Sequence, residues 1–213
     1  MSPEISDAQP EYSKPTIGIA GGIAAGKSLV AKIFEQLGGR TIDSDDLVHR
    51  ELALPEVIER YRAWWGDRIC NSDGTIDRNA VANIIFNDPD QHARMEAFLY
   101  PRLEDRRRAL TEEYRGDSDV VAIVLASPLL YEVGLDKVCD VVVFVDADRN
   151  LRLARARRNR GWSEQEFQRR ENLQKPLDKK RDAADHKVVN NSTTDALRSQ
   201  VTSLFHRLTA RPS

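Results

Sequence analysis

Apolar residues along the chain form short continuous runs that alternate with runs at helical spacing. Continuous runs at residues 17–20, 120–125 and 141–145 have the composition of strands buried on both faces of a parallel sheet. Two shorter stretches, 41–42 and 188–189, predict further strands. Because strands alternate with helices, the pattern predicts an α/β fold, a parallel β-sheet flanked by helices and joined by right-handed crossovers.

The helical stretches differ in how they begin and in how polar they are. Residues 49–116 are helical and polar, and the turn at 71–74 interrupts them. Ser163 and Glu166 form a capping box, which predicts the start of another helix. An amphipathic helix is expected over residues 197–208, at the end of the alternating series.

Length and composition indicate an ordinary globular protein. The chain has 213 residues, of which 40% are hydrophobic and 31% charged, which fits one domain with an insertion and excludes collagen-like and disordered classes. Two separated cysteines and four scattered histidines provide neither a disulfide framework nor a zinc site. Residues 1–14 hold acids and prolines and predict a flexible tail without a signal peptide. We therefore expect a cytoplasmic protein with no membrane contact.

The net charge conceals a basic segment. The whole chain has a formal net charge of −2, which argues against a dedicated nucleic-acid binder. Residues 149–187, however, contain 13 Lys or Arg against 6 Asp or Glu, a net of +7. A cationic segment on an acidic body suits a polyphosphate ligand.

Residues 21–28, GGIAAGKS, match the phosphate-binding pattern GxxxxGK[ST] in full. The glycines let the backbone curl so that N–H groups point at phosphate oxygens, and the following helix adds its positive end. In this pattern Lys27 reaches the β- and γ-phosphates, and the Ser28 hydroxyl ligates Mg²⁺. The motif predicts a P-loop NTPase fold that binds ATP and Mg²⁺ through Gly22, Ile23, Ala24, Ala25, Gly26, Lys27, Ser28 and Leu29.

Several carboxylates are candidates for the catalytic base or a metal ligand. Asp43, Asp45 and Asp46 follow the second predicted strand, where ligands gather in α/β sheets. One of them would accept the proton of an attacking hydroxyl or hold Mg²⁺, and the alternative is a capping cluster for the next helix. Asp146 follows an apolar strand as a metal ligand would, and its alternative is also a helix cap.

The basic segment includes LRLARARRNRG at residues 151–161. Its five arginines cannot share one helical face, so one or two are expected to contact triphosphate oxygens from a closing lid while the rest are solvated. No NKxD-type segment indicates a GTPase, and the length suits a small-molecule kinase.

Taken together, these motifs resemble the dephospho-coenzyme A kinase family. The resemblance runs from Thr16 to about Ser203, nearly the whole chain. Its most specific pieces are those beyond the P-loop. The matching stretches are IGIAGGIAAGKS (17–28), TIDSDDLVHREL (41–52), DGTIDR (73–78), IFNDP (85–89), YPRL (100–103), SPLLYEVGLD (127–136), RNRGWSEQEFQRR (158–170), NLQKPLDKKRDAAD (172–185) and VVNNS (188–192).

The resemblance implies transfer of the ATP γ-phosphate to the 3′-hydroxyl of dephospho-CoA, the last step of coenzyme A synthesis. It implies Asp45 as general base, lid arginines at Arg155 and Arg160, and acceptor contacts that also include His49, Pro128, Leu129 and Leu130. It further implies a kinase core at 15–48, 118–150 and 186–213, a helical acceptor-binding insertion at 49–117 and a lid at 151–185.

The sequence departs from the family pattern at four positions. Ala24 replaces the usual fourth-position glycine of the P-loop, so the loop must accept a Cβ there. Leu29 replaces a common threonine, which leaves Ser28 as the sole hydroxyl ligand. Ala126 replaces an Asp, and Tyr100 replaces a His, so no acceptor contact is assigned to Tyr100.

Two rival functions remain open at this point. One is a P-loop kinase with another nucleoside or small-metabolite acceptor. The other is a non-enzymatic nucleic-acid-binding module that uses the arginines of the lid, although the arginine segment is short and lacks interleaved aromatics beyond Trp162. For the kinase we expect a small-molecule substrate, no nucleic acid or membrane partner, and a monomer or weak homo-oligomer.

Overall fold

The computed structural model describes residues 14–210, so the expected tail at 1–14 lies almost entirely outside the described residues. The chain divides into two compact units. Unit 1 contains the described residues up to Thr41 and from Tyr114 onward, and unit 2 contains Ile42–Glu113. The predicted insertion, 49–117, begins and ends a few residues later than unit 2. At the N-terminal boundary, the strand at Gly39–Asp43 passes directly into the first helix of unit 2, which begins at Ser44.

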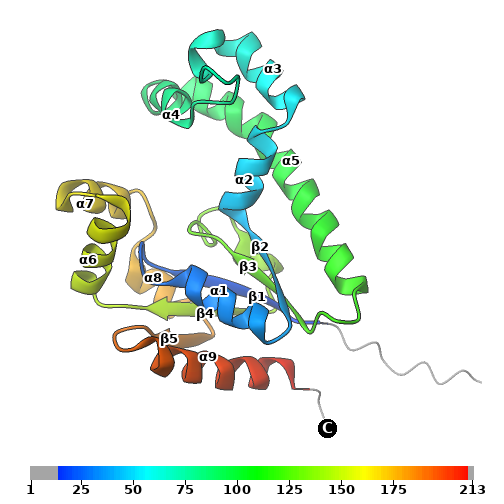
Figure 1. Cartoon of the computed structure of the whole chain (residues 1–213), viewed down its shortest axis with the longest axis vertical. Helices are drawn as coiled ribbons and strands as arrows, with labels where there is room; N and C mark the ends of the chain where they lie inside the picture. Colours follow the sequence, from blue (N-terminus) through cyan, green and yellow to red (C-terminus); the bar gives the residue numbers. More distant parts are fainter. Residues whose placement is uncertain (1–13, 211–213) are drawn as a thin grey trace, which may run out of the picture. The chain divides into compact units, whose positions relative to one another are not determined.

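Unit 1 is built on a five-stranded sheet (Figure 1). The strand order is β2-β3-β1-β4-β5, and β1 pairs in parallel with β3 and β4 while β4 pairs in parallel with β5. The strands are β1 (Thr16–Gly21), β2 (Gly39–Asp43), β3 (Ala122–Ala126), β4 (Val141–Asp146) and β5 (His186–Val189). The helices of this unit are α1 (Lys27–Gln36), η2 (Leu135–Val138), α6 (Arg149–Arg160), α7 (Glu164–Asn172), α8 (Leu177–Asp182) and α9 (Thr194–Thr209).

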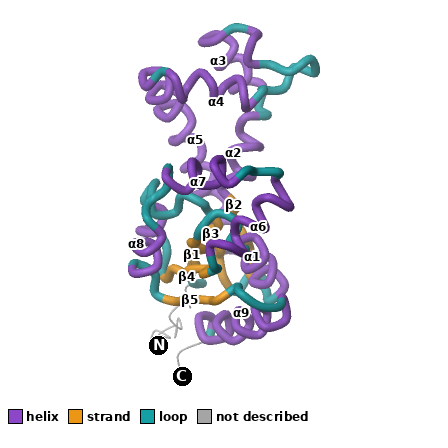
Figure 2. Tube along the Cα trace, turned by 90° about the vertical axis from the view of Figure 1, so that its left-hand side faces the viewer, coloured by secondary structure: helices purple, strands orange, loops and turns teal. Residues whose placement is uncertain are grey.

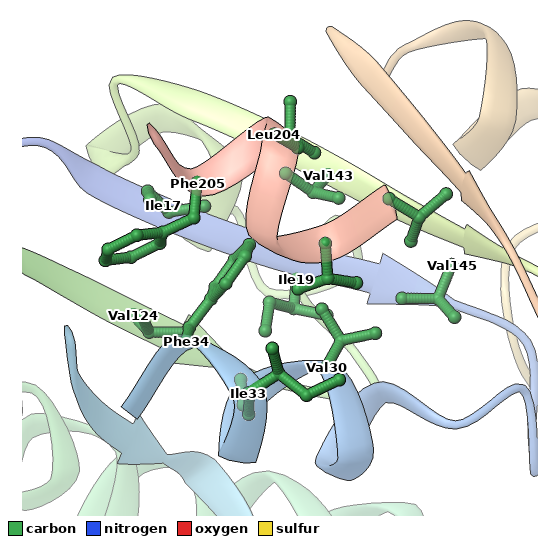
Figure 3. Close-up of a cluster of buried hydrophobic side chains, with 14 of the residues drawn as sticks. Ile17, Ile19, Val30, Ile33, Phe34, Val124, Val143, Val145, Leu204 and Phe205 are labelled. Carbon is green, nitrogen blue, oxygen red and sulfur yellow. The ribbon is translucent and has the colours of Figure 1, made fainter. Parts of the chain in front are cut away.

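Helices α1 and α9 cover one face of the sheet and form the main core with it (Figure 3). The rings of Phe34 from α1 and Phe205 from α9 lie 5.0 Å apart, and both side chains are buried. They pack against Ile17 and Ile19, alternate residues of β1 that share one face of the strand. This packing fixes the start of α1, and hence the P-loop, at the end of β1.

The opposite face of β1 lies close to the segment that follows β3. A Cβ at Gly18 would stand 2.8 Å from the Cys139 sulfur and 3.1 Å from a Leu130 methyl carbon. A glycine is therefore required at this position for close packing. As a result, Leu130 and Cys139 of this segment lie directly against the central strand.

Unit 2 is helical, with its own aromatic core. It contains α2 (Ser44–Leu52), α3 (Pro55–Trp65), η1 (Asp67–Ile69), α4 (Arg78–Asn87) and most of α5 (Pro89–Gly116). Tyr61 is fully buried, 4.9 Å from the Trp65 ring and 6.2 Å from the Phe98 ring. Within DGTIDR, the Asp73 carboxylate accepts from the Thr75 N–H and Asp77 caps α4, so this stretch has a structural role.

The predicted α/β fold with a parallel sheet is confirmed, and all five predicted strands are present (Figure 2). The predicted helix start at Ser163 is also confirmed, since the Ser163 hydroxyl accepts from the Glu166 N–H at 3.1 Å. Helix α8 was not anticipated from the pattern because its sequence, LDKKRD, has no apolar periodicity. Within residues 14–210, no helix combines the length and apolar character needed to cross a membrane.

Candidate active site

The P-loop connects β1 to α1, where the sequence motif requires it. Gly26, with φ of 103°, stands at the N-cap of α1, and the Ala25 N–H donates to the Gly22 carbonyl at 3.2 Å. The Lys27 ammonium donates to the carbonyls of Gly21 at 3.1 Å and Gly22 at 3.0 Å. The lysine therefore folds back over the loop, and its charge lies beside the backbone expected to bind phosphates.

Ala24 has an uncommon backbone conformation. Its φ is 57°, and no other non-glycine residue among residues 14–210 has a positive φ. The left-handed region costs an L-residue about 1–2 kcal/mol because its Cβ crowds the backbone. The departure from glycine noted in the sequence thus falls at a position of the loop where a Cβ introduces backbone strain.

Asn190, which follows β5, supports the P-loop from its side. The residue is 6% exposed, and its amide Nδ2 donates to the Ala25 carbonyl at 2.7 Å. A Cβ at Gly26 would stand 2.2 Å from that same Nδ2 atom, so only glycine leaves room for this amide. The Asn190 N–H in turn donates to the Asp146 carbonyl at 2.7 Å, which ties the loop to the end of β4.

Arg155 of α6 lies against the same part of the loop. Its Nη2 donates to the Asn190 carbonyl at 3.0 Å and to Oδ1 of the Asn190 amide at 3.3 Å, and its Nη1 lies 3.5 Å from the Ala25 carbonyl. The structure therefore brings this predicted lid arginine to the P-loop. A guanidinium at this place is suited to contact polyphosphate oxygens.

Arg152, one turn earlier, is buried beneath the start of the loop. It is 4% exposed; its Nη1 donates to Glu171 of α7 at 2.5 Å and to the Ile23 carbonyl at 3.4 Å. A Cβ at Gly22 would stand 2.8 Å from this Nη1. The ion pair of Arg152 and Glu171 borders a pocket of about 510 Å³. The residues that line this pocket are Ile23, Arg149, Arg152, Gln168, Glu171, Asn172, Gln174, Lys175, Pro176 and Leu177.

Arg160, the other predicted lid arginine, occupies a different environment. Its guanidinium carbon lies 4.7 Å from the centre of the Trp162 ring, and that of Arg170 lies 4.3 Å from the same ring. The structure thus places Arg160 in a cation–π stack, and the phosphate contact expected for it stays a prediction. On α7, hydrogen bonds from Arg169 and Arg170 lower the pKa of the Glu166 carboxyl.

The segment after β3 contains the predicted apolar acceptor contacts. Leu129 is 39% exposed, whereas Leu130 is 1% exposed and packs against the sheet at Gly18. The two leucines therefore differ: only Leu129 presents its side chain to an approaching ligand. Pro128 accepts a hydrogen bond from Lys180 through its carbonyl at 3.3 Å. Burial raises the pKa of the Tyr131 phenol to about 12, so this residue stays protonated.

In unit 2, α2 carries the predicted base. Asp43 is its N-cap, accepting from the N–H groups of Asp45 at 2.8 Å and Asp46 at 3.2 Å, and Asp46 pairs with Arg50 at 2.8 Å. Asp43 therefore has the capping role foreseen as an alternative for this cluster. Asp45 and His49 are both exposed and lie four residues apart, so they share one face of the helix.

Asp146, the competing metal candidate, accepts a hydrogen bond from Arg181 at 3.0 Å through its carboxylate. It is not the cap of α6, because that position belongs to Asp148. Across residues 14–210, no group of three or more His, Cys, Asp or Glu side chains is arranged to hold a metal ion. Ser28, by contrast, is exposed in the first turn of α1.

Three buried residues of this region were missed as site residues: Arg152, Lys180 and Asn190. Each is 6% exposed or less and bonds to a segment distant in sequence. For Lys180 and Asn190 a signal was present, because both belong to the quoted stretches NLQKPLDKKRDAAD and VVNNS. Arg152 was counted only as one of several arginines.

Comparisons with known proteins place these features in context. A family model described as dephospho-CoA kinase matches residues 15–196. A dephospho-CoA kinase of Geobacter metallireducens is 38% identical over 192 residues, which cover 89% of this chain and 94% of that protein. Among solved structures, a Thermus thermophilus protein has a TM-score of 0.79 at 29% identity over 93% of this chain and 100% of its own. A dephospho-CoA kinase of Campylobacter jejuni, with a TM-score of 0.64 at 18% identity, shares the fold over 92% of this chain and 98% of its own.

Proposed function

The chain belongs to the dephospho-CoA kinase family, and from this premise we propose that it transfers the γ-phosphate of ATP to the 3′-hydroxyl of dephospho-CoA. In this reaction the oxygen of the 3′-hydroxyl forms a bond to the γ-phosphorus as the bond to the β,γ-bridging oxygen breaks. The products are coenzyme A and ADP, and the hydroxyl proton passes to a base. The observation that carries the proposal is a complete P-loop between β1 and α1 in a chain matched by the family model over residues 15–196.

The ATP phosphates are expected on the P-loop, with Lys27 leaving the carbonyls of Gly21 and Gly22 to neutralise them. Arg155, whose Nη1 lies 3.5 Å from the Ala25 carbonyl of the loop, is proposed to contact the same phosphates. Mg²⁺, which neutralises phosphate charge when bound, would be held by the exposed Ser28 hydroxyl together with phosphate oxygens.

Asp45 is our proposed general base, and the resemblance of TIDSDD to the family carries that role. Near it on the same helix, Asp43 caps α2 and Asp46 pairs with Arg50. His49, on the same exposed face of α2, and the exposed Leu129 are proposed acceptor contacts.

The proposal is tested by following ADP release with dephospho-CoA, adenosine, AMP and simple sugars as alternative acceptors. We expect turnover with dephospho-CoA and the formation of coenzyme A. Lys27→Ala should lower kcat by roughly a thousandfold, since it removes a charge that stabilises the transition state. Lys32→Ala, a change to an exposed lysine on the same helix, should leave kcat unchanged.

Turnover of a nucleoside or sugar in place of dephospho-CoA would support the rival kinase with another acceptor. Salt-sensitive binding of RNA or DNA without any kinase activity would instead favour a nucleic-acid module. Either result contradicts the proposal.

The role of Asp45 is tested separately with Asp45→Asn. The amide cannot take the hydroxyl proton, so kcat should fall by roughly a hundredfold or more while ATP affinity is retained. Asp46→Asn, which alters a neighbour paired with Arg50, is the matched control. Equal kcat values for wild type and Asp45→Asn would remove the proposed base.

A further inference from the structure

Two stretches of the family resemblance, SPLLYEVGLD and NLQKPLDKKRDAAD, contain charged residues, among them Glu132 and Lys180, that have no role in the chemistry described so far. In the structure they meet. Lys180 of α8 is 2% exposed, and its ammonium pairs with the Glu132 carboxylate at 2.7 Å. The same ammonium donates to the Pro128 carbonyl at 3.3 Å and to the Gln174 side-chain oxygen at 3.3 Å. One buried charge thus contacts three oxygens from both stretches.

A second set of bonds joins the same two stretches. The Lys175 N–H donates to the Glu132 carboxylate at 2.8 Å, and the Lys175 ammonium donates to the Tyr131 carbonyl at 2.6 Å. Glu132 therefore receives donors from both Lys175 and Lys180. The backbone of residues 128–132 is bound from one side by residues 174–180.

Helix α8 is itself fixed to the sheet. Arg181 pairs with Asp146 at the end of β4, and the Asp185 carboxylate accepts from the Val142 N–H at 2.8 Å. A side-chain carbon of Leu177, three residues before Lys180, lies 3.2 Å from the position of a Cβ at Gly22. Because residues three apart share a helix face, one face of α8 contacts both the P-loop and the segment after β3.

A buried ammonium is costly unless its charge is paired and its hydrogens are bonded. Lys180 meets both conditions only when residues 128–132 adopt the conformation seen here. We propose that Lys180, paired with Glu132, is a positioning residue that holds residues 128–132 in place to receive the acceptor substrate. This inference rests on the proposed function for the identity of the acceptor, although the restraint itself does not depend on it.

The test uses the full-length enzyme with Lys180→Met, and Lys179→Met as the matched control. Lys179 is an exposed lysine on the same helix. Under the proposal, Lys180→Met raises KM for dephospho-CoA roughly tenfold because the contact segment is no longer held in position. KM for ATP should change less than about twofold, since Asn190 and Arg155 still support the P-loop.

Hydrogen exchange supplies a readout that needs no substrate. The amides of Val133 and Leu135 donate to the carbonyls of Leu129 and Leu130 in the restrained segment. Their exchange should accelerate in Lys180→Met and stay unchanged in Lys179→Met, while amides of β1 and β4 keep their protection. Unchanged exchange at these two amides, or equal increases in the KM values of both substrates, would overturn the inference.

A general loss of stability is separated from positioning by the double variant Lys180→Met/Glu132→Gln. Removing both charges leaves no uncompensated buried ion, so the melting temperature should recover relative to Lys180→Met. KM for dephospho-CoA should remain raised, because the Lys180 restraint is still absent. Recovery of KM along with the melting temperature would contradict positioning. If wild type does not turn over dephospho-CoA, the proposed function fails, and hydrogen exchange alone decides this inference.

Discussion

The P-loop and helix α6 are neighbours in unit 1 that present positive charge in different ways. The loop relies on backbone groups and small residues, with Lys27 folded over the carbonyls of Gly21 and Gly22. Helix α6 presents long guanidinium side chains, and those of Arg152 and Arg155 bond to carbonyls of the loop. Arg158, three residues beyond Arg155, is exposed and bonds to its own neighbour Asn159.

The difference teaches that the position of a charge along α6 matters more than the number of charges. Arg152 and Arg155 are three residues apart and share a helix face, yet one is buried against Glu171 and the other lies half-buried beside Asn190. The first is expected to affect mainly stability and the second mainly catalysis. Substitutions of Arg152 and Arg155 separate the effect on stability from the effect on catalysis.

The largest expected effect is on stability, from Arg152→Leu. Removing one partner of a buried ion pair leaves Glu171 without its closest cation, which costs about 3–5 kcal/mol of unfolding free energy. Urea denaturation followed by circular dichroism measures this. Arg158→Leu on the exposed face is the control and should change the free energy by less than about 0.5 kcal/mol. A loss below about 1 kcal/mol for Arg152→Leu would show that the pair is not structurally important.

The next effect is on catalysis, from Arg155→Gln. Loss of the charge proposed to contact the transferring phosphate should lower kcat roughly a hundredfold with little change in melting temperature. Arg155→Lys should not restore full activity, because an ammonium cannot reproduce the several donors of a guanidinium. Steady-state kinetics for these variants and for Arg158→Gln provide the comparison. Equal kcat values for Arg155→Gln and Arg158→Gln would refute the distinction between the half-buried and the exposed arginine.

The smallest effect concerns the P-loop itself. Ala24→Gly removes the Cβ from a residue with φ of 57° and should stabilise the fold by about 1 kcal/mol. Ala154→Gly, an exposed change within α6, should have the opposite sign because glycine weakens a helix by about 1 kcal/mol. Thermal melts of both variants test this. A destabilising Ala24→Gly would show that the alanine is accommodated without strain.

Much of the fold was predictable because it depends on local patterns. Continuous apolar runs located β1, β3 and β4, and the capping box located the start of α7 at Ser163. The bounds of the individual helices between residues 44 and 116 were less predictable, since polar helices carry little periodicity. Helix α8 was not predicted for the same reason. Contacts of Lys180, Arg181 and Leu177 hold its six residues in place, and it has no apolar stripe.

Some residues of the candidate site were likewise predictable from local sequence, and others were not. The P-loop motif identified Lys27 and Ser28, because a phosphate cradle is formed by consecutive residues. The sequence alone treated Leu129 and Leu130 as equivalent, whereas the structure exposes the first and buries the second. The sequence also does not distinguish Arg152, which pairs with Glu171, from the other arginines of its segment.

By itself, the sequence determined the α/β architecture, the phosphate-binding loop and the family resemblance. Each of these depends on short contiguous stretches of residues or on the order of such stretches along the chain. Only the tertiary structure decided which charges act together. Lys180 and Glu132 lie 48 positions apart in the chain, and Asn190 and Ala25 lie 165 apart, so no local pattern predicts that they meet. Burial decides their energetic roles, since removing one partner of a buried contact leaves a polar group or a charge uncompensated, whereas an exposed ion pair contributes little.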